Sequence, residues 1–369
     1  MEFEVHIAHS IAEIDQEAWD RLSGDHIFAS YRWYRFGEAV LASDTPPTYV
    51  VLSWKGEPVA RGTFWLSGQE FIPLPPGALR RLVEALVRRW PLMMCRSPLA
   101  NAAGLILPES DLHDAALRTL AQVALEEARR CRASFLIFGH LEGRQAHDAA
   151  WPEGFVPVTL PDPGTRLVVT WPDFESYLAS LSKSVRKDYR RHRNRAADLG
   201  VVVTHRRVTS PLDEGVLDEA MTLIHNVENH HRLPHYKWAR AILQNAHLVD
   251  AAWLTAEIGE RLVGCGLLLG DRGTWCLASL GLDYEFNYVY FQLLYQAIRC
   301  AIEEQDIHVL RGGSEVYETK QRLGFQLEDS HHLIFAGAGA LPRALGQWLA
   351  GRIARPEPVQ IAQEAVDEP

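Results

Sequence analysis

The segment from Thr274 to Phe325 constrains the fold more than any other part of the chain. It begins with a strand-like stretch rich in Trp, Cys and Leu, and an amphipathic stretch follows. The apolar residues of the second stretch recur at the i, i+3, i+4, i+7 spacing of one helix face: Val289, Leu293, Leu294, Ala297, Ile298, Ala301 and Ile302. A short apolar strand (Ile307–Leu310), the Gly312–Gly313 turn and a short polar helix come next. This order predicts a right-handed crossover unit, and ligands collect where the strands of such a unit end.

The same order of elements occurs twice in the chain. Paired strand-like stretches stand at Thr48–Leu66 and again at Ala252–Leu269, each around a tight turn. Each pair is followed by an amphipathic helix, a short strand and a Gly-Phe dipeptide; these are residues 111–131, 134–138 and 154–155 in the first copy and 288–304, 307–310 and 324–325 in the second. The repeat is too long for a solenoid. It predicts two copies of one α/β domain, each with its own sheet.

Proline and aspartate punctuate the chain near Trp171–Pro172, where we place the boundary between the two copies. The expected domains are an N-terminal one over residues 1–168 and a C-terminal one over residues 169–340. We expect a strand at Leu333–Phe335 to close the second domain. Residues 341–369 predict a short helix and then an acidic, disordered tail.

Composition narrows the class of protein. A net charge of −10 argues against a protein that coats nucleic acid in general, and no DNA partner is expected, although a local basic patch stays open. No apolar run approaches the roughly 18 residues of a membrane-spanning helix, so no membrane span is expected. The five cysteines are dispersed, which indicates a reduced, cytoplasmic setting. His230, His231 and His235 lack the spacing of a metal motif, so no metal site is expected. The sequence carries no signal for an oligomeric state.

The stretch from Lys183 to Arg195 is strongly basic in this acidic chain. It holds seven cationic residues and one acid, Asp188; the cations are Lys183, Arg186, Lys187, Arg190, Arg191, Arg193 and Arg195. One interpretation is a solvated helix face. The other is a phosphate-binding surface with Arg186 and Arg190 as ligands, because a guanidinium donates two parallel hydrogen bonds to a phosphate.

Two blocks of sequence carry a family resemblance. One is Tyr317-Glu318-Thr319-Lys320 with the Leu323-Gly324-Phe325 turn after it, and the other is the basic block that begins at Phe174 and runs to Val203. Together they resemble the FemAB/BioF2-like (CelD-like) branch of the GNAT acyltransferases, over about Trp171 to His331. The resemblance implies an α/β fold of two tandem GNAT-like domains, each a mixed twisted sheet flanked by helices. It also implies an active C-terminal domain and an N-terminal domain that is structural or binds the acceptor.

The implied activity is N-acyl transfer by direct attack of an amine on an activated acyl group. The implied co-substrate is acyl-CoA, with no tightly bound cofactor, and the acceptor is a small-molecule or peptide amine. GNAT proteins hold the CoA pyrophosphate on a glycine-containing loop at a helix N-terminus. The corresponding residues, Asp283–Tyr290, contain no glycine and two acids. Two alternatives therefore stay open: a transferase that uses aminoacyl-tRNA to form a peptide bond, and a non-catalytic binding protein on a degenerate GNAT scaffold.

The resemblance places the catalytic residues in the short helix near the end of the unit. Lys320 is expected to face the cleft and to contact a substrate phosphate or the reacting carbonyl. Tyr317 lies one turn earlier on the same helix face, so it either donates a proton to the leaving group or packs. Glu315 either orients Lys320 or acts as a base; alternatively, it only complements the helix N-terminus. The alternative interpretation of Lys320 is a surface lysine with no role in catalysis.

Further residues are expected to bind the substrate or the donor. Besides the two arginines of the basic stretch, these are Asp283, Glu285, Asn287, Tyr290, Gln292, His230 and Ser314. Asp283 and Glu285 would bind a cationic amine or, alternatively, complement the start of the long helix. His230 lies on a helix that would border the acceptor. The cleft is expected between Asp283–Tyr290 and Ser314–Lys320.

Overall fold

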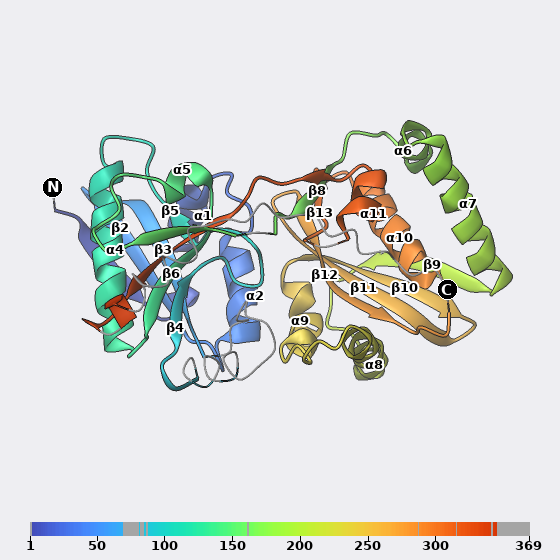
Figure 1. The fold of residues 1–369 in the computed structure, drawn as a ribbon, viewed down its shortest axis with the longest axis horizontal. Helices are drawn as coiled ribbons and strands as arrows, with labels where there is room; N and C mark the ends of the chain where they lie inside the picture. Colours follow the sequence, from blue (N-terminus) through green and yellow to red (C-terminus); the bar gives the residue numbers. More distant parts are fainter. Residues whose placement is uncertain are drawn as a thin grey trace.

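The computed structural model describes residues 2–68, 81, 85, 88–160, 162–286, 288–314, 316–340 and 342–344. These residues form two mixed sheets, each flanked by helices (Figure 1). The predicted fold class of two tandem α/β units is confirmed. The expected helix and tail over residues 341–369 lie almost wholly outside the described residues. No described helix combines the length and the apolar character needed to span a membrane.

The first sheet has the strand order β1-β2-β3-β4-β6-β15-β7, and β5 pairs with β3. Its strands are β1 (Glu4–Ala8), β2 (Pro47–Trp54), β3 (Glu57–Ser67), β4 (Leu92–Cys95), β5 (Leu105–Ile106), β6 (Phe135–Leu141), β7 (Val156–Thr159) and β15 (His332–Gly337). The helices of this half are η1 (Ile11–Glu13), α1 (Gln16–Ser23), α2 (Tyr31–Leu41), α4 (His113–Arg130) and α5 (Gly143–Ala146).

The second sheet has the strand order β14-β8-β13-β12-β11-β10-β9. Its strands are β8 (Thr165–Val168), β9 (Val201–Arg207), β10 (Asp250–Ile258), β11 (Arg261–Asp271), β12 (Thr274–Leu282), β13 (Val309–Arg311) and β14 (Gln326–Leu327). The helices of this half are α6 (Phe174–Ser180), α7 (Lys183–Asp198), α8 (Glu214–His230), α9 (Ala239–Asn245), η2 (Ala246–Leu248), α10 (Val289–Glu303) and α11 (Tyr317–Arg322).

The internal repeat seen in the sequence is present in the structure. The hairpin β2-β3 corresponds to β10-β11, and helix α4 corresponds to α10. In each sheet the helix connects two parallel neighbours, β4 with β6 and β12 with β13. These are the crossover units that the sequence predicts.

One expectation about strand pairing is wrong. The predicted strand at Leu333–Phe335 exists as β15, but it pairs with β6 and β7 in the first sheet instead of closing the second (Figure 1). In exchange, β8 pairs with β13 and β14 of the second sheet. Each half thus contributes a strand to the other across the expected boundary at residue 168, and the division at that residue stays a prediction. An apolar strand pattern shows that a strand forms but not which edge it joins, so the sequence could not show the exchange.

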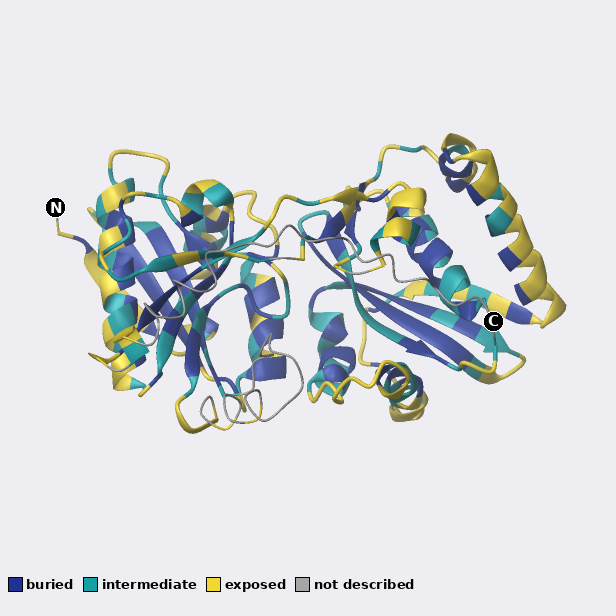
Figure 2. Ribbon diagram, in the orientation of Figure 1, coloured by how far each residue is buried: buried dark blue, intermediate teal, exposed yellow. Residues whose placement is uncertain are grey.

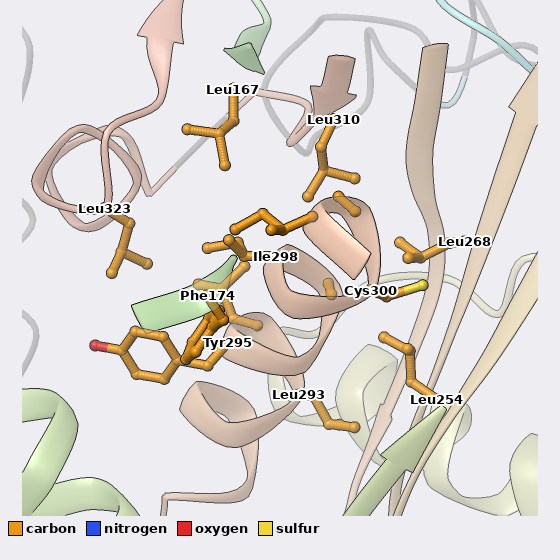
Figure 3. Close-up of a cluster of buried hydrophobic side chains, with 14 of the residues drawn as sticks. Leu167, Phe174, Leu254, Leu268, Leu293, Tyr295, Ile298, Cys300, Leu310 and Leu323 are labelled. Carbon is orange, nitrogen blue, oxygen red and sulfur yellow. The ribbon is translucent and has the colours of Figure 1, made fainter. Parts of the chain in front are cut away.

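Helix α10 organises the core of the second half. All seven residues of its predicted apolar face are buried, and they pack on the sheet and on α6 and α7 (Figures 2 and 3). Gly264 of β11 permits this close approach, because a Cβ atom there would lie 2.4 Å from Val289 Cγ1. On the other sheet face, a Cβ atom on Gly281 would lie 2.8 Å from Leu223 Cβ of α8. The glycines of the neighbouring strands β11 and β12 therefore allow α10 to pack closely on one face of the sheet and α8 on the other.

A hydrophobic cluster joins the two halves. It combines Trp19, Phe28 and Trp33 with apolar residues of α8, α9 and the second sheet. At its border, the buried carboxylate of Asp271 accepts hydrogen bonds from the backbone N–H groups of Ala29 (2.9 Å) and Ser30 (3.2 Å). The two sheets are thus held together by packing and by buried hydrogen bonds.

Candidate active site

The parallel strands β12 and β13 separate soon after they meet. Three residues of β12, Thr274–Cys276, pair with Val309–Arg311, after which β13 ends and β12 continues to Leu282. A cavity of about 290 Å³ lies at this fork. Its walls in the second half include Cys276, Leu277, Ala278, Gly313 and Ser314. Its walls in the first half include Phe28, Leu99, Ala100, Asn101 and His140. The cavity therefore lies between the two halves, at a strand end, which is where α/β proteins commonly bind ligands.

Arg311 connects the two walls of the cavity. Its Nε and Nη2 donate to Glu328 Oε1 at 2.6 Å and Oε2 at 2.5 Å, and its Nη1 donates to the carbonyl of Asn101 at 3.0 Å. Both side chains of the ion pair are only 10% exposed. Although burial opposes ionisation, the hydrogen bonds from His331 and Arg311 lower the pKa of Glu328 to about 2. The cavity thus contains a fixed guanidinium in a water-poor setting.

Two histidines meet in the cavity, one from each half of the chain. The rings of His140 on β6 and His331, just before β15, lie edge to face with centroids 5.6 Å apart. Burial, and then the charges of His331, Arg96 and Arg311, lower the pKa of His140 to about 3, so this ring is neutral at physiological pH. Its buried Nδ1 has no hydrogen-bond partner among the described residues. His331 Nε2 lies 3.4 Å from Arg311 Nη2 and 3.5 Å from Glu328 Oε2. The site therefore offers imidazole nitrogens next to a fixed positive charge.

The cysteine in the cavity wall is not an activated nucleophile. Burial raises the pKa of the Cys276 thiol to about 11, and the nearby Arg311 only partly opposes this. The thiol is therefore protonated at neutral pH. Chemistry here would proceed without a covalent cysteine intermediate.

Comparisons with known proteins identify this architecture. Residues 183–319 match the acetyltransferase (GNAT) domain family. A tandem GNAT protein from the clavulanic acid biosynthesis pathway superposes with a TM-score of 0.55 at 15% identity, over 92% of this chain and 99% of that one. The chain has the tandem GNAT fold.

Other solved structures agree with this assignment. The tandem GNAT fold also matches FemX, with a TM-score of 0.61 and 11% identity over 94% of this chain and 100% of that one. The C-terminal domain of a putative lysylphosphatidylglycerol synthetase from Agrobacterium fabrum gives a TM-score of 0.51 at 13% identity, over 93% and 97% of the two chains. No curated protein matches the chain. At these identities the likeness concerns the fold, which is the one that the FemAB/BioF2-like resemblance implied.

Within the tandem GNAT fold, α11 lies behind the cavity and braces its wall. Lys320 is buried, and its Nζ donates to the carbonyls of Ser314 at 2.9 Å and Gly313 at 3.5 Å. The Tyr317 hydroxyl donates to the carbonyl of Pro163 at 2.9 Å, beside the cavity-lining Gly164. Ser314 itself lines the cavity, as expected, but Lys320 and Tyr317 are not among the lining residues. The structure thus gives these two side chains positioning contacts.

The predicted residues around the start of α10 form a second group, away from the cavity lining. Asp283 Oδ2 and Glu285 Oε2 lie 2.6 and 3.6 Å from Arg261 Nη2, so a cation already occupies the place expected for an amine. The His230 ring stacks on Tyr284 with centroids 4.0 Å apart. Tyr290 and Gln292 are half-buried on α10; Tyr290 packs against the core, and Gln292 Nε2 is buried with no hydrogen-bond partner among the described residues. Their expected binding roles stay predictions.

The basic helix α7 is capped at its N-terminus by Ser182, whose Oγ accepts a hydrogen bond from the backbone N–H of Val185 at 3.4 Å. Arg186 does not point freely into solvent, because it donates to the carbonyls of Ala179 and Leu181 at the end of α6. Arg190 is exposed on the same helix. Glu315 and Asn287, also predicted, lie outside the described residues.

The sequence did not indicate His140, Arg311 or His331 as site residues. Arg311 stands directly before the Gly312–Gly313 turn, and that position at a strand end is a signal that could have singled it out. His140 and His331 are far apart in the chain and meet because β15 returns to the first sheet beside β6. No local pattern encodes that return.

Proposed function

We propose that this protein is an N-acyltransferase that moves an acyl group from an activated donor, acyl-CoA in the first instance, to the amine of a small molecule or peptide. The observation that supports this most is the cavity at the fork of β12 and β13, with Arg311 and a histidine from each half. The GNAT domain match over residues 183–319 supports the reaction class.

The reaction would proceed by direct attack. The amine nitrogen attacks the acyl carbonyl, the new C–N bond forms, and the C–S bond of the thioester breaks. His331 takes the proton from the amine and returns it to the departing thiolate, so atoms and charge balance. The guanidinium of Arg311 stabilises the negative charge that develops on the carbonyl oxygen. Neutral His140 hydrogen-bonds the acceptor without adding a second positive charge. Lys320 and Tyr317 hold the two loops that form the cavity wall.

The second candidate uses aminoacyl-tRNA as the donor and forms a peptide bond. The observation that favours it is the row of exposed cations along α7: Lys183, Lys187, Arg190, Arg191, Arg193 and Arg195. Binding of a polyanion to this helix would weaken steeply as salt rises. Either donor suits a cytoplasmic enzyme, and the five free cysteines fit that reducing setting.

Thermal-shift measurements with CoA, acetyl-CoA, a long-chain acyl-CoA and charged tRNA test which donor the protein binds. A ligand of the native state raises the melting temperature. We expect an acyl-CoA to do so. The rise should be smaller in Lys320→Ala, because the Ser314 carbonyl loses its hydrogen bond from Lys320 Nζ. Each variant is compared with its own ligand-free melting temperature. Arg322→Ala is the matched control, because this exposed cation on the same helix pairs with Asp188 on the surface.

The outcomes separate the candidate functions. A rise with an acyl-CoA in wild type and Arg322→Ala, reduced in Lys320→Ala, supports the acyl-CoA enzyme. A rise with charged tRNA alone supports the peptide-bond-forming alternative. No rise with any of these ligands contradicts both donors and favours a non-catalytic binding protein on a degenerate GNAT scaffold.

A further inference from the structure

Three potential metal ligands meet at the C-terminal end of α8. His225, Glu228 and His235 each bring one ligand atom into a group whose members lie within 4.8 Å of one another. His225 and Glu228 are three residues apart, so they share one face of α8. His235 comes from the exposed loop that follows, and its ring stacks on that of His225 at a centroid distance of 4.1 Å and an interplanar angle of 8°. Two imidazoles and a carboxylate form a ligand set typical of zinc and other divalent transition metals.

Glu228 has an oxygen that nothing else in the described structure satisfies. The residue is only 9% exposed, and its Oε1 accepts a hydrogen bond from the backbone N–H of Tyr236 at 2.8 Å. The other oxygen, Oε2, is buried and has no hydrogen-bond partner among the described residues. A buried carboxylate oxygen without a donor destabilises the fold. A cation at the centre of the cluster would satisfy it.

His235 is held as metal-binding histidines commonly are. Its Nε2 lies 3.1 Å from Asn229 Oδ1, so the amide oxygen accepts the Nε2–H hydrogen. The tautomer with Nε2 protonated leaves the lone pair of Nδ1 available to a metal. A carbonyl oxygen that fixes the tautomer and orientation of a histidine ligand is a typical outer-shell partner in metal sites.

Two other groups of potential ligands in the described chain differ from this one, because their charges and lone pairs already have partners. In the group of His113, Asp114 and Asp148, the two ring nitrogens of His113 contact the Pro108 carbonyl at 3.1 Å and Asp148 at 2.8 Å.

In the second group, His205, Cys300 and Glu304, the Glu304 carboxylate pairs with Arg207 at 2.9 Å. Burial raises the pKa of the Cys300 thiol to about 12, so it is protonated at neutral pH. Neither group needs a bound metal ion to neutralise its charge or to satisfy its lone pairs.

We propose that His225, Glu228 and His235 bind one divalent transition-metal ion of the Zn²⁺ class, with water in the remaining position. Zinc ligands stand about 2.0–2.2 Å from the ion, and an imidazole binds it in the plane of the ring, so the stacked ring of His235 turns away from that of His225 and the three ligand atoms move closer together when the ion binds. The exposed side chain of His235 allows this movement. The ion would tie the loop after α8 to the helix. Tyr236, the next residue, lines the cavity between the two halves, so the metal would also fix one part of the cavity wall.

Titration of the metal-stripped full-length protein with ZnCl₂ in a calorimeter tests the proposal. We expect one Zn²⁺ ion per chain in wild type and loss of this site in His235→Ala and Glu228→Gln. Asn229→Ala is expected to weaken binding by about 10–100-fold, as removal of an outer-shell partner does elsewhere. His231→Ala is the matched control, because His231 is a neighbouring exposed histidine outside the cluster. Its affinity for Zn²⁺ should equal that of wild type.

Thermal melts separate loss of the site from loss of the fold. Because His235 is exposed, His235→Ala should melt at the same temperature as wild type when no zinc is present. Added zinc should raise the melting temperature of wild type and leave that of His235→Ala unchanged. The proposal is overturned if wild type binds no Zn²⁺. It is equally overturned if His235→Ala and Glu228→Gln bind Zn²⁺ as tightly as wild type. The test does not involve acyl transfer, so its result is independent of the proposed enzymatic function.

Discussion

Replacement of His331 by glutamine is expected to lower the turnover number of acyl transfer by about 10²–10⁴-fold, the usual contribution of a positioned general base. Glutamine keeps a polar side chain of similar length but cannot take a proton from the attacking amine. The Arg311–Glu328 pair beside the ring would remain, so the KM for the donor should change little. The measurement is the steady-state release of CoA thiol with an acyl-CoA and a panel of amine acceptors.

His332→Gln is the matched control for this prediction. His332 is the next residue, but its Nδ1 contacts the Thr159 hydroxyl at 3.2 Å, and it does not line the cavity. Its replacement should leave turnover within about threefold of wild type, since a side chain that does not touch the reacting groups contributes little to the transition state. An unchanged turnover in His331→Gln, or an equal loss in both variants, contradicts the assignment of His331 as the base.

The largest stability effect is expected at Arg311. Its replacement by alanine leaves the buried Glu328 carboxylate without its guanidinium partner and removes the hydrogen bond to the Asn101 carbonyl. Breaking a buried ion pair in this way lowers the free energy of unfolding by about 3–5 kcal/mol. The measurement is urea denaturation, with the midpoint and slope determined for each variant.

Arg118→Ala serves as the control for Arg311→Ala. Arg118 also pairs with a carboxylate, that of Asp114 at 3.3 Å, but the two side chains are 58% and 62% exposed. An exposed pair contributes at most about 1 kcal/mol. We expect Arg311→Ala to lose several times more stability than Arg118→Ala. Equal losses in the two variants would contradict the view that Arg311 and Glu328 form a buried pair that Arg311 links to the Asn101 carbonyl of the first half.

The Arg311–Glu328 ion pair also makes the stability of the protein depend on pH. The pKa of Glu328 is about 2 in the folded protein, below the ordinary value of 4.5. A group whose pKa is depressed by folding stabilises the protein fully above its unfolded pKa, and this stabilisation disappears as the pH falls through the folded pKa. The contribution of Glu328 should therefore decline between about pH 4.5 and pH 2. Glu328→Gln should show a weaker loss of stability across this range than wild type.

Much of the fold could be predicted from periodicity alone. The apolar spacing from Val289 to Ile302 and the repeated hairpin-helix-strand order predicted the two sheets and their crossover helices, and the structure confirms both. These signals are local, because they arise from one face of one helix or from one strand. The pairing of β15 and β8 is not local, and it depends on which sheet edge is free after the rest of the chain has folded. That is why the strand at Leu333–Phe335 was expected in the wrong sheet.

The site was less predictable for a related physical reason. The sequence drew attention to Ser314, which lines the cavity, and to Tyr317 and Lys320, whose contacts brace its wall. It missed His140 and His331 because they come together only through the returning strand. The amine-binding role expected for Asp283 and Glu285 stays a prediction, and a sequence does not show that Arg261 lies beside both carboxylates. Charges that look available in a sequence are often paired in the folded chain.

The proposed active site is tested most directly by asking whether the acyl donor binds in the cavity between the halves. Ala278→Trp would fill the fork of β12 and β13, whereas Thr204→Trp would place the same bulk on an exposed strand, in a hollow that lies elsewhere. The measurement is calorimetric titration of wild type and both variants with the acyl-CoA that raises the melting temperature most. We expect wild type and Thr204→Trp to bind it alike and Ala278→Trp to lose at least 100-fold in affinity, about 2.7 kcal/mol. Undiminished binding by a folded Ala278→Trp protein would contradict the placement of the active site in this cavity.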